Sequence, residues 1–216
     1  MVRFIVFDLD GTLVDSRQDL AESANALLAA CSCPTQTETA IGRMVGDGAA
    51  TLVARAFAAG GCPAPADALA RFLAIYETRL LRCTRPYPEI ESVLAALEPR
   101  LPIAVLTNKP LASTRRILDG LGLARFFPSD LVFGGDGPHP RKPDPAGLRG
   151  LCDRTGVAPA ATLMVGDSVI DWRTARAAGT RICLAGYGFG FDGFPIDELA
   201  PDEVAIESPS ALLTLL

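Results

Sequence analysis

The sequence predicts an α/β fold, in which helices cover a parallel sheet and an all-helical segment is inserted after the first strand. From residue 86 onward, short apolar runs alternate with amphipathic stretches, as in chains that build parallel sheets. Residues 15–85 show helical periodicity without a convincing strand. Polar residues follow several expected strands at their carboxyl ends, where open α/β sheets bind ligands.

The first expected strand covers residues 3–9, because its apolar run is rich in Val, Ile and Phe. Leu and Ala residues at helical spacing then predict a helix over residues 17–30, which Ser16 can cap. The rest of the insertion is expected to hold a glycine-rich loop and two further helices, over residues 41–48, 49–59 and 66–83.

The remaining chain alternates between the two kinds of element. Strands are expected over residues 103–106, 131–133, 162–165, 181–184 and 204–206. Helices are expected over residues 90–97, 111–121, 145–155 and 170–178, and from Ser210. The pattern therefore describes a Rossmann-like parallel sheet core made of residues 1–14 and 86–216. The helical segment 15–85 forms a second domain, with hinges near Asp15 and Arg85.

Composition limits the classes of function. The chain of 216 residues is 49% hydrophobic and 21% charged, which supports a packed core, and its net charge of −5 argues against a nucleic-acid surface. Lys109 and Lys142 are the only lysines among twenty basic residues. A chain that uses Arg elsewhere can need a compact ammonium at these two places, although codon bias alone gives the same pattern.

The six cysteines are scattered, and none forms the usual spacing of a zinc or redox motif. We therefore expect free thiols in a reducing compartment. The apolar run at the N-terminus is too short for a signal peptide, and no segment is long and apolar enough to span a membrane. A cytoplasmic protein that binds neither membrane nor nucleic acid, as a monomer or homodimer, is expected.

Two carboxylates end the first strand. Asp8 and Asp10 lie two residues apart, so in extended chain their side chains point the same way. Two such charges about 4 Å apart repel by roughly 4 kcal/mol at an effective dielectric near 20, and a divalent cation turns that repulsion into attraction. The alternative is an ordinary acidic turn, since Asp and the following Gly11 are common turn residues.

Further polar groups follow other strands. Thr107 and Asn108 follow the second core strand, Asp167 and Ser168 the fourth, and Lys142 precedes a helix. Taken singly, these residues could be a loop start, a helix cap and a solvated lysine. Together they supply hard oxygen ligands that suit Mg²⁺, a hydroxyl donor and a point charge, which can hold a phosphate beside a metal ion.

In the order of its motifs the chain resembles the haloacid dehalogenase-like phosphatase superfamily: Asp8-x-Asp10-Gly11-Thr12, Thr107-Asn108, Lys142-Pro143 and Gly166-Asp167-Ser168-x-x-Asp171. The resemblance implies that Asp8 attacks phosphorus and that Asp10 serves as general acid and then as general base. It implies Mg²⁺ bound by Asp8, the backbone carbonyl of Asp10, and Asp167. Asp171 and Ser168 would support the metal site, and Thr107, Asn108 and Lys142 would bind the phosphoryl group.

The inserted helices resemble the mobile cap of the phosphoglycolate-phosphatase-like branch. Val45-Gly46-Asp47-Gly48-Ala49 and Gly186-Tyr187-Gly188-Phe189-Gly190 look like segments of those enzymes. The implied activity is hydrolysis of a small phosphorylated metabolite, 2-phosphoglycolate, through an aspartyl phosphate. Arg43 and the loop of Gly46, Asp47 and Gly48 are hypothesised to face the substrate carboxylate; the alternative is a structural loop with a solvated Arg.

Other functions stay open at this point. Within enzymes they are a sugar- or amino-sugar-phosphate phosphatase, a pyrophosphatase and a hexose phosphomutase. From another class, the chain could be a metabolite-binding or interaction protein that has kept the scaffold, but the candidate nucleophile and Lys142 are both present. A receiver domain would offer an aspartate that accepts a phosphoryl group, but not the helical insertion or the acid at Asp10.

Overall fold

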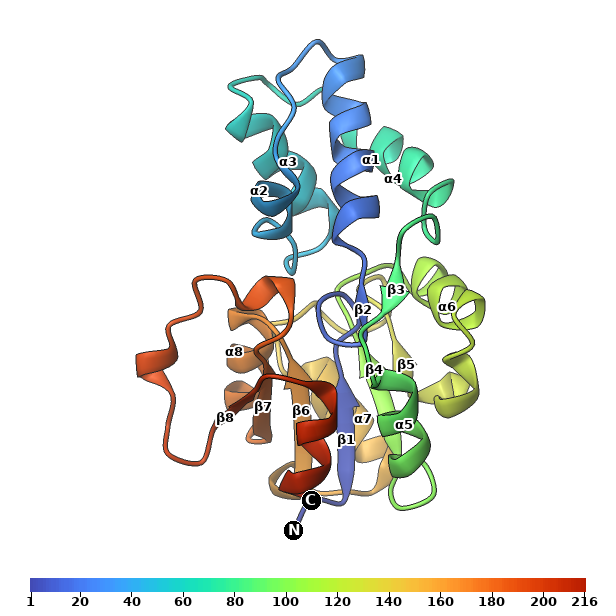
Figure 1. Cartoon of the computed structure of the whole chain (residues 1–216), viewed down its shortest axis with the longest axis vertical. Helices are drawn as coiled ribbons and strands as arrows, with labels where there is room; N and C mark the ends of the chain where they lie inside the picture. The colour runs from blue at the N-terminus through green and yellow to red at the C-terminus, as the bar shows by residue number, and fades with distance from the viewer.

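The computed structural model describes residues 1–216 as a sheet-based core with a group of helices above one end of the sheet (Figure 1). Six strands form one sheet in the order β5-β4-β1-β6-β7-β8, and every neighbouring pair is parallel. The strands are β1 (Phe4–Phe7), β4 (Ile103–Leu106), β5 (Val132–Phe133), β6 (Thr162–Gly166), β7 (Arg181–Ala185) and β8 (Val204–Ile206). The α/β class and the parallel sheet predicted from the sequence are confirmed.

Alternation along β1 explains how the sheet is covered. Successive side chains of a strand point to opposite faces, and Phe4 and Val6 pack with residues of α7 and α8, whereas Ile5 and Phe7 pack with residues of α5 and α6. All four side chains of β1 are buried, because both faces carry helices. These helices are α5 (Ile90–Leu97), α6 (Leu111–Gly120), α7 (Ala146–Thr155) and α8 (Val169–Ala178).

The four helices that stand apart from the sheet follow β1 in the chain, and we call them the cap (Figure 1). They are α1 (Arg17–Ala30), α2 (Glu38–Gly42), α3 (Ala49–Ala59) and α4 (Ala68–Glu77). The expected helices over 17–30 and 49–59 are confirmed. The expected helix over 66–83 is shorter, because the Thr78 hydroxyl donates to the Ile75 carbonyl at 2.8 Å and the chain continues in turns.

Two short strands connect the cap to the core, although no strand was expected between residues 15 and 85. β2 (Val14–Asp15) pairs antiparallel with β3 (Arg85–Pro86). Strands of only two residues are too short to produce a periodic pattern in the sequence. Buried Asp19 of α1 strengthens this junction, since its carboxylate accepts from the backbone N–H groups of Cys83 and Thr84 at 2.9 and 2.7 Å.

The end of the chain differs in small ways from expectation. The helix expected from Ser210 is a 3₁₀ helix over Pro209–Leu215, and further single turns of 3₁₀ helix lie in the loops. The glycine-rich loop is preceded by α2, a helix of one turn that was not expected and that begins at a Thr37 cap. No helix of the structure is long and apolar enough to cross a membrane.

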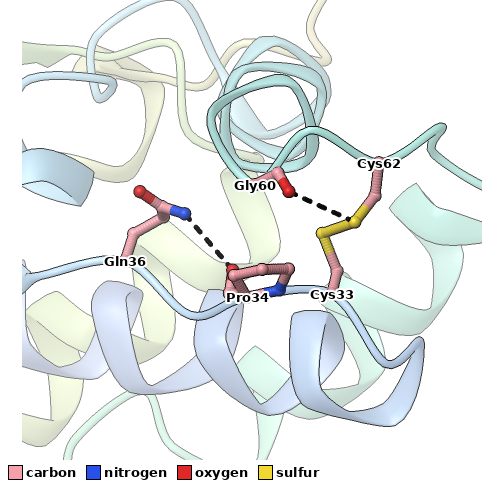
Figure 2. Close-up of a disulfide and its surroundings, with 5 residues drawn as sticks. All are labelled: Cys33, Pro34, Gln36, Gly60 and Cys62. Atoms are coloured by element: carbon pink, nitrogen blue, oxygen red, sulfur yellow. Dashed lines mark hydrogen bonds between the residues drawn. A yellow bond between two sulfur atoms is a disulfide. The ribbon is translucent and has the colours of Figure 1, made fainter.

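The expectation of six free thiols is wrong for one pair. Cys33 and Cys62 form a disulfide between the turns that follow α1 and α3, with 6.1 Å between their Cα atoms (Figure 2). The two residues are 29 positions apart, and only the packing of these helices brings them together. The argument from free thiols to a reducing compartment therefore loses its support.

Candidate active site

The site is built at the carboxyl end of the sheet. Asp8 follows β1, Thr107 follows β4 and Asp167 follows β6, and these three strands are neighbours in the sheet. Because they are parallel and in register, the residues after them meet at one edge. Gly11, with φ +87°, leaves the room that the Asp167 carboxylate fills, since a Cβ there would overlap that group.

Three buried carboxylates gather at this edge. One oxygen from each of Asp8, Asp167 and Asp171 lies within 4.8 Å of the others. Lys142 is the cation among them: its Nζ donates to Asp171 Oδ1 at 2.6 Å and lies 2.8 Å from Asp8 Oδ1, off the direction of a good hydrogen bond. Three hard oxygen donors facing one ammonium fit a divalent cation of the Mg²⁺ type.

Burial and crowding perturb the titration of these groups. Burial raises the pKa of Asp8 to about 7, against the lowering effect of the Lys142 ammonium. The pKa of Asp167 also lies well above its ordinary value, because of burial and the nearby charges of Asp171 and Asp8. Burial lowers the pKa of Lys142, but the two carboxylates that it contacts more than offset that, so the net direction is upward.

Asp171 and Ser168 act together at the start of α8. The Ser168 backbone N–H donates to Asp171 Oδ2 at 3.1 Å and the Asp171 backbone N–H donates to the Ser168 hydroxyl oxygen at 3.4 Å, which forms a capping box; the hydroxyl itself donates to Asp171 Oδ2 at 2.6 Å. The other oxygen of Asp171 holds Lys142. Asp171 therefore fixes the helix, the lysine and one corner of the carboxylate cluster at once.

Asn108 links three segments rather than standing alone. Its amide exchanges two hydrogen bonds with the backbone of Lys142, at 2.8 and 2.9 Å, and donates a third to the Gly46 carbonyl of the cap at 2.8 Å. Thr107 is buried beside it and accepts from the Lys109 backbone at 3.2 Å, which leaves its hydroxyl proton free for another acceptor.

Asp10 is held by two donors. The Lys109 Nζ lies 2.9 Å from both of its carboxylate oxygens, and the Ser16 hydroxyl donates to Oδ1 at 2.5 Å. Ser16 does precede α1, but its side chain makes no capping hydrogen bond and bonds Asp10 instead. Lys109 was not among the expected site residues, although its rarity in an arginine-rich chain was a signal that could have included it.

A cavity lies between the cap and the carboxylate cluster. Asp8, Asp10 and Asp167 line its floor, and Tyr76 of α4 lines it from the cap. Burial raises the pKa of Tyr76 to about 12, so its hydroxyl keeps the proton. The cap and the core thus enclose these carboxylates together.

The candidate cap residues divide into two groups. Gly46 and Gly48 line the cavity, with φ of +116° and +88°. Arg43 does not line it: its guanidinium pairs with Asp192 of the core at 2.8 Å and is largely exposed. The Asp47 carboxylate pairs with Arg55 at 2.6 Å.

Comparison with known proteins identifies relatives over most of the chain. A family model described as haloacid dehalogenase-like hydrolase matches residues 2–179. A phosphoglycolate phosphatase of Rhodospirillum rubrum is 46% identical over 88% of this chain and 81% of its own, and one of Pseudomonas putida is 38% identical over 98% and 78%. The crystal structure of a predicted phosphoglycolate phosphatase from Haemophilus somnus superposes with a TM-score of 0.88 at 31% identity, covering 99% of this chain and 97% of its own.

Proposed function

This chain belongs to the haloacid dehalogenase-like hydrolase family, and we propose that it is a Mg²⁺-dependent phosphatase whose preferred substrate is 2-phosphoglycolate. Asp8 carries the proposal, because it is a buried carboxylate at a strand end, beside a lysine and two further carboxylates, and this setting suits a nucleophile that acts next to a bound cation. The names of the relatives support the choice of substrate.

The residues present divide the work of binding. Asp8 and Asp167, with the backbone carbonyl of Asp10, would hold the ion, which when bound would withdraw charge from the phosphoryl oxygens. Thr107 donates its free hydroxyl proton to the phosphoryl group. Lys142 keeps one N–H beyond its two carboxylate contacts, and we assign this donor to the same group.

Hydrolysis then takes two displacements at phosphorus. An oxygen of Asp8 attacks, the bond from phosphorus to the leaving oxygen breaks, and Asp10 gives its proton to that oxygen. In the second step Asp10 removes a proton from water as the water attacks the aspartyl phosphate. The bond from phosphorus to Asp8 breaks, and inorganic phosphate and the free carboxylate are released.

The cap excludes bulk water during the first displacement. Apolar side chains of its helices, Leu52, Phe72 and Leu73 among them, face the cavity above the carboxylates. A dry cavity strengthens every charge interaction inside it and protects the first step from competing solvent. The hydrogen bond from Asn108 to Gly46 closes part of the boundary between cap and core.

A panel of phosphorylated compounds tests the proposal. Release of phosphate is measured with Mg²⁺ from 2-phosphoglycolate, sugar and amino-sugar phosphates and pyrophosphate, and sugar phosphates are also analysed for isomers. Asp8→Asn should lower turnover by at least about 10⁴-fold, as expected for loss of a nucleophile. Asp153→Asn, which changes an exposed carboxylate on α7, is the matched control and should keep full activity.

Three results would overturn the proposal. They are absence of phosphate release from every compound, equal activity of the Asp8→Asn variant, and conversion of one sugar phosphate into its isomer without release. A preference for another phosphomonoester would keep the mechanism and replace the substrate. A cytoplasmic location and a monomeric or homodimeric state stay predictions.

A further inference from the structure

Lys109 is a buried cation that lines the cavity between cap and core. It is the only cationic side chain among the residues that line the cavity, and it is buried. An ammonium has three N–H groups, and the two oxygens of Asp10 lie 2.9 Å from this one. A buried cation with a donor to spare is a site for an anionic ligand group.

Tyr76 lies directly against that cation. The Lys109 Nζ is 4.7 Å from the centre of the Tyr76 ring. The tyrosine is 4% exposed, and the only polar group beside its hydroxyl is the Lys109 ammonium, which can donate but not accept, so the hydroxyl proton has no acceptor. Buried hydroxyl groups nearly always make hydrogen bonds, so a hydroxyl proton that lacks an acceptor and faces a cavity indicates a binding position for a ligand that accepts it. The only other orphaned side-chain oxygens are on Asp8 and Thr12.

The position of this pair relative to the reaction follows from Asp10. The general acid must reach the oxygen that leaves phosphorus, so Lys109, which is bonded to Asp10, lies on the leaving-group side. In 2-phosphoglycolate the carboxylate is separated from the leaving oxygen by a single methylene carbon. A carboxylate so close to the scissile bond falls within reach of groups that surround Asp10.

No other side chain of the cavity carries a positive charge. Its cap side is otherwise apolar, with Val45, Leu52 and Phe72 in the wall. Arg43, the other cation considered for this task, is paired with Asp192 and does not line the cavity. Because Thr107 is assigned to the phosphoryl group, a carboxylate on the leaving-group side has one cation, Lys109, and one hydroxyl proton without an acceptor, that of Tyr76.

We propose that Lys109 Nζ and the Tyr76 hydroxyl form a carboxylate-binding subsite, which selects phosphomonoesters with a carboxylate one carbon from the ester oxygen. This subsite rests on the proposed phosphatase function and extends it, because it names the two residues that select the class of substrate. One member comes from the core and the other from the cap, so a substrate with this carboxylate bridges the two domains.

The test compares 2-phosphoglycolate with ethyl phosphate, which has the same ester and no carboxylate. Tyr76→Phe removes only the hydroxyl and should lower kcat/KM for 2-phosphoglycolate by at least about tenfold, as for loss of a hydrogen bond to a charged group. Turnover of ethyl phosphate should change less than twofold. Tyr87→Phe, at a tyrosine outside the cavity, is the matched control and should change neither substrate.

Two further measurements separate recognition from structure. Because the Tyr76 hydroxyl donates to no group in the free protein, the thermal midpoint of Tyr76→Phe should stay close to that of the wild type. Lys109→Met should slow both substrates, since it frees Asp10, but should reduce the preference for 2-phosphoglycolate over ethyl phosphate by at least about tenfold.

Equal losses on the two substrates in both variants, or no loss in either, would overturn the subsite. A wild-type protein that hydrolyses both substrates equally well would also overturn it, while the phosphatase mechanism stands. Absence of hydrolysis of any phosphomonoester by the wild type would overturn the proposed function and the subsite with it.

Discussion

Replacing Lys142 by Met removes the one cation inside the carboxylate cluster. In the structure its side chain is 2% exposed, and its Nζ lies 2.8 Å from Asp8 Oδ1 and 2.6 Å from Asp171 Oδ1. Lys142→Met keeps much of the aliphatic stem but leaves three buried carboxylates facing one another. We expect a large loss of stability that depends on pH in a defined direction.

The magnitude follows from the two contacts. At an effective dielectric near 20, each contributes about 6 kcal/mol at these distances. Burial of the ammonium offsets several kcal/mol of that sum, and breaking a buried pair by removing one partner costs about 3–5 kcal/mol in practice. We therefore expect the free energy of unfolding to fall by about 3–5 kcal/mol at pH 8 without metal.

The sign of the pH dependence is fixed by Asp8. Its pKa in the folded protein is raised from 3.8 to about 7 even with Lys142 present, and removal of the lysine raises it further. Above about pH 7 the folded wild type no longer binds this proton, whereas the folded variant still does, so only the variant goes on losing stability as pH rises. The deficit of Lys142→Met should thus be larger at pH 8 than at pH 5.

Urea unfolding followed by circular dichroism, in EDTA at both pH values, measures the effect. Arg173→Met, at an exposed cation on α8, is the matched control and should change stability by less than about 0.5 kcal/mol. A deficit below about 1 kcal/mol at pH 8 would refute the assigned contacts, because it falls short of the cost of breaking a buried pair. A deficit that does not change with pH would refute the link to Asp8.

Two other predictions concern the metal site and the cap. Mg²⁺ at a hundredfold excess over its dissociation constant should add about 2.7 kcal/mol of stability. This gain in stability should shrink as pH falls, because Asp8 and Asp167, whose pKa values are raised, must be deprotonated to bind Mg²⁺. Thermal unfolding with and without Mg²⁺ at pH 8 and pH 5 measures the gain, with Asp167→Asn as comparison. Replacing Cys33 and Cys62 by Ser should lower the free energy of unfolding by about 2–4 kcal/mol. The kcat at 25 °C should stay within twofold, since the disulfide joins turns at the ends of α1 and α3. A larger loss of kcat in steady-state assays would contradict the view that the disulfide acts on stability alone.

Sequence reasoning could predict that the core residues of the candidate site lie together, because each of them follows a strand. Asp8, Thr107 and Asp167 sit one position beyond three apolar runs, and parallel pairing of those runs brings them to one edge. Helices with strong periodicity, such as α1 and α3, could be bounded almost to the residue. These features depend on local pattern and on one rule of topology.

Features that depend on packing between distant segments could not be predicted. The disulfide requires α1 and α3 to end side by side, and β2 and β3 exist only because the chain leaves and re-enters the core at one place. The Ser16 hydroxyl was expected to cap α1, but it donates instead to the carboxylate of Asp10, six residues earlier in the chain. The meeting of Lys109 with Tyr76 joins core to cap and has no local signal.

The central claim is that the Asp8 carboxylate receives the phosphoryl group. Mass spectrometry of enzyme quenched in acid during steady-state turnover of 2-phosphoglycolate tests this most directly. We predict a phosphorylated peptide with the phosphoryl group on Asp8, absent from the Asp8→Asn protein. Rapid turnover with a phosphoryl group on another residue would contradict the mechanism built here.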